Sequence, residues 1–198
     1  MRSGVFGGTF DPVHLGHTAI ARGALLRAQL DRVLVLPVGT PAHRSTHASA
    51  ADRAAMLRLA LAGEDDRIQF DATALEQQGP VFTADTLALV HAANPADALN
   101  FIAGADSLAR SVWRRLDEVA RAVERFYVVP RRGSDWPDVL AVIAHLPPDL
   151  QTRFERLDVV VPDIEASEIR ARVKAGESIA DFVVEPVAQY ISERGLYR

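Results

Sequence analysis

The first chemical signal in the chain is a glycine-rich stretch that carries two histidines. Residues 4–17 read GVFGGTFDPVHLGH, with Gly7 and Gly8 directly after a short apolar run. Glycine has no Cβ and lets a ligand approach the main chain. His14 and His17 are three residues apart, so both face the same side if a helix begins here. Because a helix N-terminus offers free N–H groups and a partial positive charge, the stretch predicts a phosphate-binding turn.

Two other interpretations of this stretch stay open. Paired helical histidines can bind metal, but the metalloprotease pattern spaces them four apart around a glutamate, whereas Leu15 and Gly16 lie between these two. The second interpretation is a glycine turn in which the histidines are incidental. Under the phosphate interpretation, Gly16 also permits close approach at the helix start, and a bound polyanion favours the charged imidazoles.

The segment GGTFDPVHLGH resembles the signature of the nucleotidyltransferase superfamily that carries the T/HxGH motif. In that superfamily the two histidines contact the triphosphate and stabilise the pentavalent transition state, a role that the resemblance implies for His14 and His17. Class I aminoacyl-tRNA synthetases carry a related HIGH motif, but they are far longer and have tRNA-binding regions. The resemblance assigns to the ATP site Gly7, Gly8, Thr9, Phe10 and Gly16.

A second phosphate motif is expected near the C-terminal end. Residues 164–170, IEASEIR, resemble the superfamily's ISSTxIR, which caps a helix that meets the β- and γ-phosphates. Ser167 is a reasonable N-cap, and Arg170 can pair with phosphate through two hydrogen bonds. The alternative is an ordinary cap beside a surface arginine. Glu165 and Ala166 replace two serines of the family, and a carboxylate here repels a triphosphate unless it points away or binds through Mg²⁺.

Further stretches narrow the resemblance to the bacterial nicotinate mononucleotide adenylyltransferases. Residues 101–108, FIAGADSL, resemble the GxD segment of that family, which implies that Gly104 and Asp106 lie at the nucleotide ribose. Trp113 follows as in the family, where the indole stacks on the pyridine ring. An aromatic face suits a flat, charged heterocycle, but a core tryptophan is the alternative.

Other segments resemble the acceptor side of the same family. VFTADTL resembles YTxxTL, whose threonine and neighbouring N–H groups hold the nicotinate carboxylate. PVGTPAHR resembles a loop whose cation meets the mononucleotide phosphate, and YVVPRRG and EPVAQYISERGLY match a strand-loop and a C-terminal helix. The resemblance assigns to the acceptor site His43, Arg44, Phe82, Thr83, Trp113 and Arg131.

The elements that must hold these motifs alternate along the chain. Short β-branched or aromatic runs predict strands at 3–6, 32–38, 68–72, 100–103, 125–129 and 158–161. Helical patterns occupy 18–30, 50–62, 83–93, 113–122, 136–145, 167–175 and 185–193. This alternation predicts an α/β fold, a Rossmann-like doubly wound and mainly parallel sheet with helices on both faces. A long loop at 39–49 is expected at the carboxyl end of the second strand, where such sheets bind ligands.

Length and composition limit the classes of function. The chain has 198 residues, no cysteine and a formal net charge of −4. We expect one domain over residues 1–198, with a helical portion at about 164–198. The lack of cysteine excludes disulfides, thiolate metal sites and cysteine nucleophiles, and the acidic balance argues against a general nucleic-acid binder. No apolar run reaches the ~18 residues of a membrane span, so we expect a cytoplasmic protein with no membrane or nucleic-acid partner.

The resemblance implies a reaction in which ATP and nicotinate mononucleotide give deamido-NAD and pyrophosphate. His14, His17 and Arg170 would be catalytic, and the acceptor's own 5′-phosphate would be the nucleophile. No carboxylate cluster suggests a dedicated metal cage, so Mg²⁺ is expected to enter with ATP. Two alternatives remain: a sibling enzyme acting on nicotinamide mononucleotide or phosphopantetheine, and a nucleotide-binding regulator with weakened catalysis. The sequence leaves a homo-oligomer open.

Overall fold

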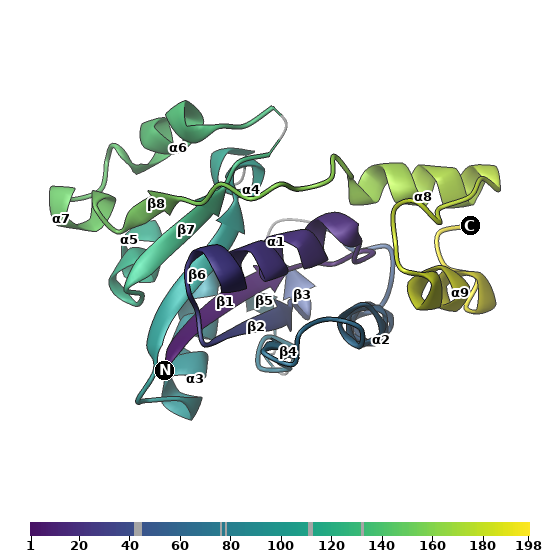
Figure 1. Ribbon diagram of the computed structural model, residues 1–198, viewed down its shortest axis with the longest axis horizontal. Coiled ribbons are helices and arrows are strands. Elements are labelled where there is room, and N and C mark those ends of the chain that lie inside the picture. The colour runs from purple at the N-terminus through teal and green to yellow at the C-terminus, as the bar shows by residue number, and fades with distance from the viewer. Residues whose placement is uncertain (42–44, 76, 78, 111–112, 132) are drawn as a thin grey trace.

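The computed structural model describes residues 1–41, 45–75, 77, 79–110, 113–131 and 133–198. The strands are β1 Arg2–Gly8, β2 Arg32–Pro37, β3 Thr40–Pro41, β4 Ile68–Phe70, β5 Pro80–Val81, β6 Ala98–Gly104, β7 Arg125–Val129 and β8 Phe154–Arg156. The helices are α1 Leu15–Arg27, α2 Ala50–Leu61, α3 Thr83–Ala93, α4 Ala105–Arg110, α5 Leu116–Arg121, α6 Trp136–Ile143, α7 Pro148–Gln151, α8 Ala166–Ala175 and α9 Glu185–Glu193. Six strands form one parallel sheet in the order β4-β2-β1-β6-β7-β8, and β3 pairs with β5 in a second (Figure 1).

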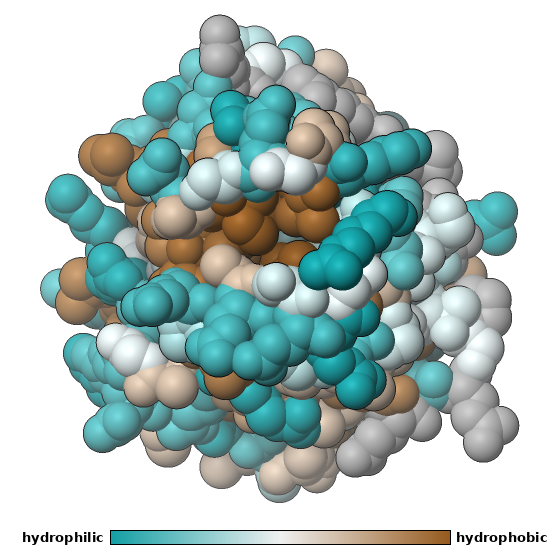
Figure 2. All heavy atoms as spheres, turned by 90° about the vertical axis from the view of Figure 1, so that its right-hand side faces the viewer, coloured by the Kyte–Doolittle hydropathy of each residue, from teal (hydrophilic) through white to brown (hydrophobic). Residues whose placement is uncertain are grey.

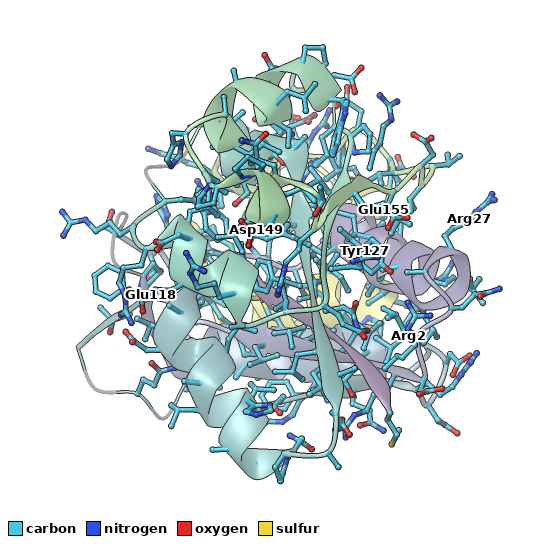
Figure 3. All side chains as sticks on the ribbon, turned by 90° about the vertical axis from the view of Figure 1, so that its left-hand side faces the viewer. Arg2, Arg27, Glu118, Tyr127, Asp149 and Glu155 are labelled. Carbon is cyan, nitrogen blue, oxygen red and sulfur yellow. The ribbon has the colours of Figure 1, made fainter. Side chains whose placement is uncertain are left out.

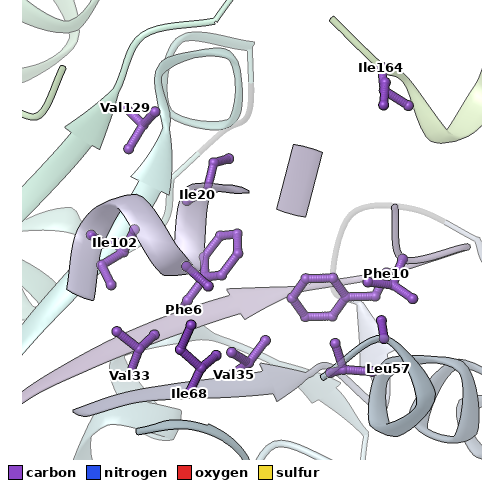
Figure 4. Packing of buried hydrophobic residues seen from close by; sticks show 14 of the residues in the cluster. Phe6, Phe10, Ile20, Val33, Val35, Leu57, Ile68, Ile102, Val129 and Ile164 are labelled. Atoms are coloured by element: carbon purple, nitrogen blue, oxygen red, sulfur yellow. The ribbon is translucent and has the colours of Figure 1, made fainter. Parts of the chain in front are cut away.

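The central strands are buried on both faces of the sheet. In β1, Phe6 packs in the core that includes residues of α1, α2, α8 and α9, whereas Val5 packs in the core of α3, α5 and α6. Val35 and Leu34 of β2 divide between the same two cores, and Figure 4 shows the first of them, with Ile20 of α1 above Phe6. A strand covered on both faces needs a nearly continuous apolar run. The predicted doubly wound α/β fold is therefore confirmed.

The winding of the sheet changes direction at β1. This strand pairs in parallel with β2 on one side and with β6 on the other. Beyond β2 lies β4, and beyond β6 lie β7 and β8. Ligands of open α/β sheets bind outside the carboxyl ends of the strands at such a switch point. The first motif follows β1 and the GxD segment follows β6, so the topology brings both motifs to one edge.

Helices α8 and α9 lie together beyond the carboxyl ends of β1 and β2 (Figure 1). Ile169 of α8 and Val187 of α9 are buried in the same core as α1 and α2. The hydroxyl of Tyr190 on α9 donates to Oδ1 of Asp52 on α2 at 3.0 Å. The second motif, at the start of α8, is thereby held at the edge of the sheet where the first motif lies.

Hydrogen bonds and an ion pair connect side chains at the amino-terminal edge of the sheet, opposite the edge where the two motifs lie. Arg2 donates through Nη2 to the Tyr127 hydroxyl at 3.2 Å (Figure 3). Ser3 donates to Asp97 at 2.6 Å, and Arg32 pairs with the same carboxylate at 2.7 Å. These contacts fix the start of β1 against β2 and β6, and so help to fix where its carboxyl end lies.

Several elements differ from the sequence prediction. Residues 158–161, predicted as the last strand, have no regular structure, and the strand is instead β8 at Phe154–Arg156. Val160 is 94% exposed, so this run of valines is not a buried strand. The helices α4 and α7, with 6 and 4 residues, are too short to show a helical period. The small β3–β5 sheet begins inside the predicted loop 39–49.

Candidate active site

A cavity of about 430 Å³ opens at the carboxyl ends of β1, β2 and β6. Its volume is within the range of small-molecule sites. Figure 2 views the molecule from the side of α8 and α9, and shows a hydrophobic hollow framed by hydrophilic side chains. The cavity wall contains, of the residues predicted from sequence, Gly7, Gly8, Thr9, Phe10, His14, His17, Phe82, Thr83, Gly104, Asp106, Trp113, Arg131, Ser167 and Arg170.

Of the three other predicted site residues, two lie outside the described part of the chain and one, Gly16, is not in this wall. His43 and Arg44 lie outside the described residues. Gly16 is buried, and a Cβ built on it would lie 3.0 Å from Cε1 of His14. This glycine therefore makes room for the His14 ring, and its place in the ATP site stays a prediction.

The last residues of β1 expose the main chain to the cavity at Gly7. A Cβ at Gly7 would meet no atom of the described residues within 4 Å, whereas one at Gly8 would lie 2.8 Å from the Phe10 ring. Phe10 has a φ of 51° and is 2% exposed. Its ring lies edge-on to that of His17, with centroids 4.9 Å apart. The Phe10 side chain therefore supports the imidazole, while Gly7 leaves the main chain open to a ligand.

The two histidines form a stacked pair at the start of α1. His14 is the N-cap residue and His17 lies in the first turn. Their ring centroids are 3.7 Å apart and the ring planes are inclined by 33°. The backbone N–H of His14 donates to Nδ1 of His17 at 3.2 Å. Because Nδ1 accepts this bond, a neutral His17 carries its proton on Nε2 and can donate from there.

Both imidazoles are neutral in the free protein at pH 7. Burial lowers the pKa of His14 to about 3, and the positive charge of Arg131 acts in the same direction. Burial also lowers the pKa of His17 well below its ordinary value, with smaller contributions from His14 and Arg131. The charged pair predicted from sequence thus requires the bound polyanion, whose charge raises both pKa values. Nδ1 of His14 is buried without a hydrogen-bond partner among the described residues, as expected of a polar site that a ligand completes.

Arg131 connects the first and second motifs. Its Nη2 donates to the carbonyl oxygen of Ile164, the first residue of the second motif, at 2.7 Å. Its Nη1 lies 3.8 Å from Oδ2 of Asp106. The same guanidinium is near enough to lower the pKa values of His14 and His17. Arg131 therefore lies beside the residues predicted to bind ATP, although the resemblance assigned it to the acceptor.

The start of α8 differs from its predicted cap. Glu165 is the N-cap residue and makes no side-chain cap bond, whereas Ser167, the predicted N-cap, lies inside the first turn. The Ser167 hydroxyl donates to Oε2 of Glu165 at 3.1 Å. The backbone N–H groups of Ala166 and Ser167 have no acceptor within the described structure. Arg170 donates through Nη1 to the carbonyl oxygen of Asp11 at 2.8 Å, which joins the second motif to the first.

The start of α3 contributes another helix N-terminus to the cavity wall. Phe82 is its N-cap residue and makes no side-chain cap bond. The N–H groups of Thr83 and Ala84 have no acceptor among the described parts of the chain. Free N–H groups at the positive end of a helix suit a carboxylate or phosphate.

Trp113 belongs both to the core and to the cavity wall. Its ring lies edge-on to Phe101 and Phe126, at centroid distances of 5.9 and 5.7 Å. Its Nε1 donates to the carbonyl oxygen of Ser107 at 3.0 Å. These contacts fix the indole beside the cavity and support the core alternative, while its contact with a pyridine ring stays a prediction.

Sequence reasoning missed a buried arginine behind the first motif. Arg53 of α2 is 0% exposed and donates to the carbonyl oxygens of Thr9 and Val38, each at 2.7 Å, and of Gly39 at 2.6 Å. It joins the turn after β1 to the loop after β2. In the sequence it is one arginine among several in a helical pattern, with no local sign of a buried guanidinium.

Comparison with known proteins gives the family. The family model described as cytidylyltransferase-like matches residues 5–172. The chain belongs to this family. Among curated relatives, a protein of Solibacter usitatus is 38% identical over 202 residues, covering 100% of both chains, and one of Symbiobacterium thermophilum is 36% identical, covering 99% of this chain and 95% of its own. Both are named probable nicotinate-nucleotide adenylyltransferase, in agreement with the family that the motifs indicated.

Solved structures show the same fold. The nicotinic acid mononucleotide adenylyltransferase of Plasmodium falciparum, complexed with NaAD, aligns with a TM-score of 0.78 and 16% identity, covering 99% of this chain and 97% of its own. A second structure of that protein, complexed with APC, aligns with a TM-score of 0.75. At this identity the likeness supports the fold.

Proposed function

We propose that this protein transfers the adenylyl group of ATP to nicotinate mononucleotide, giving deamido-NAD and pyrophosphate. The observation that carries the proposal is one cavity that gathers the stacked His14 and His17, the open main chain at Gly7, and Arg170. Donors that converge on one place suit a triphosphate whose charge moves onto the leaving pyrophosphate. The full-length relatives named for this activity support the same reaction.

The chemistry needs alignment more than acid–base catalysis. An oxygen of the acceptor's 5′-phosphate attacks the α-phosphorus of ATP and forms a new P–O bond. The bond from the α-phosphorus to the bridging oxygen breaks, and its electron pair leaves on pyrophosphate. A phosphate monoester is largely ionised at pH 7, so no protein base has to remove a proton. The protein instead holds two polyanions in line and stabilises the charge that moves between them.

The proposed roles follow from the position of each group. His17 donates from Nε2 to a phosphate oxygen of ATP, and His14 acts beside it. Arg170 and the backbone N–H of Ser167 bind the leaving pyrophosphate, and Asp106 accepts hydrogen bonds from the ribose hydroxyls. The proposed ATP site further includes Gly7, Gly8, Thr9, Phe10 and Gly104.

The acceptor is proposed to bind at the wall formed by α3 and Trp113. The free N–H groups of Thr83 and Ala84 would hold the nicotinate carboxylate, and the fixed indole would contact the pyridine ring. Phe82 lies at the same helix end. Arg131 also lies in the cavity wall, and the acceptor role that the resemblance gave it stays a prediction. His43 and Arg44, predicted for the acceptor phosphate, stay predictions.

Mg²⁺ is proposed to enter the cavity bound to ATP. In the described residues, no group of three or more His, Asp or Glu side chains is arranged to hold a metal ion. Glu165 and Asp106 are single carboxylates in the cavity wall, which fits a cation carried mainly by phosphate oxygens and water. When bound, the ion neutralises charge on the phosphates. The protein's part is to hold those phosphates with N–H donors.

We also propose that residues 1–198 act as one nucleotidyltransferase unit in the cytoplasm. Helix α8 supports this, because it carries the second motif and its Arg170 contacts Asp11 of the first. The described helices include none long and apolar enough to cross a bilayer. Every group used in the proposed reaction comes from one copy of the chain, and the homo-oligomer left open by the sequence stays a prediction.

The proposed function is tested by pyrophosphate release with three acceptors. Nicotinate mononucleotide, nicotinamide mononucleotide and phosphopantetheine are each supplied with ATP and Mg²⁺. We expect kcat/KM to be highest by at least about tenfold for nicotinate mononucleotide, because its charged carboxylate accepts stronger hydrogen bonds at the positive end of α3 than a neutral amide oxygen does. A higher kcat/KM for phosphopantetheine, or no pyrophosphate from any acceptor, would contradict the proposal.

A further inference from the structure

A single buried aspartate joins four segments of the chain beside the proposed phosphate site. Asp11, in the first motif, is 6% exposed. Its carboxylate accepts from the backbone N–H groups of His47 at 2.7 Å and Ala48 at 3.1 Å, and from the Tyr197 hydroxyl at 2.7 Å. Its carbonyl oxygen accepts from Arg170 at 2.8 Å. The turn after β1, the loop before α2, helix α8 and the end of the chain therefore meet at this residue.

The contact from Tyr197 is the most distant of these along the sequence. Tyr197 is the second-last residue, and its φ of 65° is in the left-handed region. A bulky residue adopts that conformation only where its surroundings hold it. Here the ring is partly buried against the first core, and the hydroxyl reaches Asp11. Tyr197 is thus fixed to the first motif.

The Tyr197 hydroxyl helps to lower the pKa of Asp11. Burial by itself raises the pKa of Asp11, but the hydrogen bonds from His47, Tyr197 and Ala48 outweigh it and lower that pKa. Removing a donor from a buried carboxylate leaves an oxygen partly unsatisfied, and such bonds to charged groups are among the stronger ones in proteins. Asp11 would then shift toward other donors or water, and would move the main chain that carries it.

A movement of Asp11 would displace the groups that are proposed to donate hydrogen bonds to the phosphates. Asp11 follows Phe10, whose ring supports His17, and its carbonyl oxygen fixes Arg170. Because close alignment of donors decides how well a polyanion is bound, a small displacement here weakens several contacts together.

We propose that Tyr197 is a positioning residue of the triphosphate site and acts through Asp11. The inference rests on the proposed function, because it takes the cavity beside His14 and His17 as the ATP site. Tyr197 itself touches the Asp11 carboxylate and is absent from the cavity wall as described.

The test compares two single-hydroxyl deletions at the C-terminal end of the chain. Tyr197→Phe removes the bond to Asp11 and keeps the ring. The matched control, Tyr190→Phe, removes a bond of similar length to Asp52, which keeps Ser49 and Arg194 as partners. The dissociation constant of Mg²⁺·α,β-methylene-ATP is measured by calorimetry, well below the melting temperature of each variant. Because the unfolded fraction does not change the dissociation constant of the folded protein, this readout separates positioning from stability.

We expect Tyr197→Phe to weaken binding of the analogue about five- to tenfold, from the loss of one hydrogen bond to a charged group. Tyr190→Phe should stay within about twofold of the unmodified protein. Equal dissociation constants for the two variants would overturn the inference, as would binding too weak to measure in the unmodified protein. If the unmodified protein binds the analogue but releases no pyrophosphate with any acceptor, the proposed reaction fails, while the comparison of the variants still decides the role of Tyr197.

Discussion

Replacing His17 with alanine is expected to lower kcat about 10²- to 10³-fold, the usual cost of removing one preorganised donor to transition-state charge. The effect should fall on turnover because His17 is a fixed donor. Its Nδ1 is occupied by the His14 N–H, its Nε2 carries the proton, and Phe10 supports the ring. Pyrophosphate release at saturating ATP and acceptor measures the change.

The matched control for this variant is His91→Ala. His91 is an exposed histidine in the last turn of α3, and its replacement should leave kcat within about twofold. Thermal unfolding of both variants separates loss of chemistry from loss of fold. Turnover of His17→Ala close to that of the unmodified protein would remove this histidine from the mechanism.

The second large effect is expected from one methyl group at Gly7. A Cβ there would meet no atom of the described residues within 4 Å, so Gly7→Ala should fold normally and keep its melting temperature. The same methyl would project into the cavity where the phosphates of ATP are proposed to lie against the main chain. A displacement of about 1 Å can cost 10²-fold, so kcat/KM for ATP should fall about 10²-fold.

Gly63→Ala controls for the general effect of adding a methyl group. Gly63 lies just beyond the end of α2, and a Cβ there would also meet no atom within 4 Å. Its kcat/KM for ATP should stay within about twofold. If Gly7→Ala keeps full kcat/KM, the main chain at Gly7 is not where ATP is bound.

Much of the fold could be predicted because local patterns and packing agree. The strand at 125–129 and the helices at 83–93 and 185–193 were placed at their observed bounds. In α9, Pro186 sits in the first turn and Gly195 follows the end, an arrangement that marks both ends of a helix. The strand predicted at 158–161 was wrong. Three consecutive valines are typical of a buried strand, but tertiary structure decides which residues are buried, and Val160 is almost fully exposed.

In the site, too, features that depend on local sequence could be predicted, and features that depend on contacts between distant segments could not. His14 and His17 could be found because their spacing puts both on one helix turn. The stacking of their rings and the depression of their pKa values could not, because these depend on burial and on Arg131, more than a hundred residues away. Arg53 and Tyr197 were missed for a related reason. Each acts through main-chain or carboxylate oxygens of a distant segment, and no local pattern marks such a contact.

The central claim is that the hollow between Gly7 and the His14–His17 pair receives the phosphates of ATP. It is tested most directly by a crystal structure of the protein with Mg²⁺ and α,β-methylene-ATP. The account predicts phosphate oxygens within hydrogen-bond distance of an imidazole of the pair and of Arg170, with the phosphate chain against the main chain at Gly7. A nucleotide bound elsewhere, with side chains of the protein filling that hollow, would contradict it.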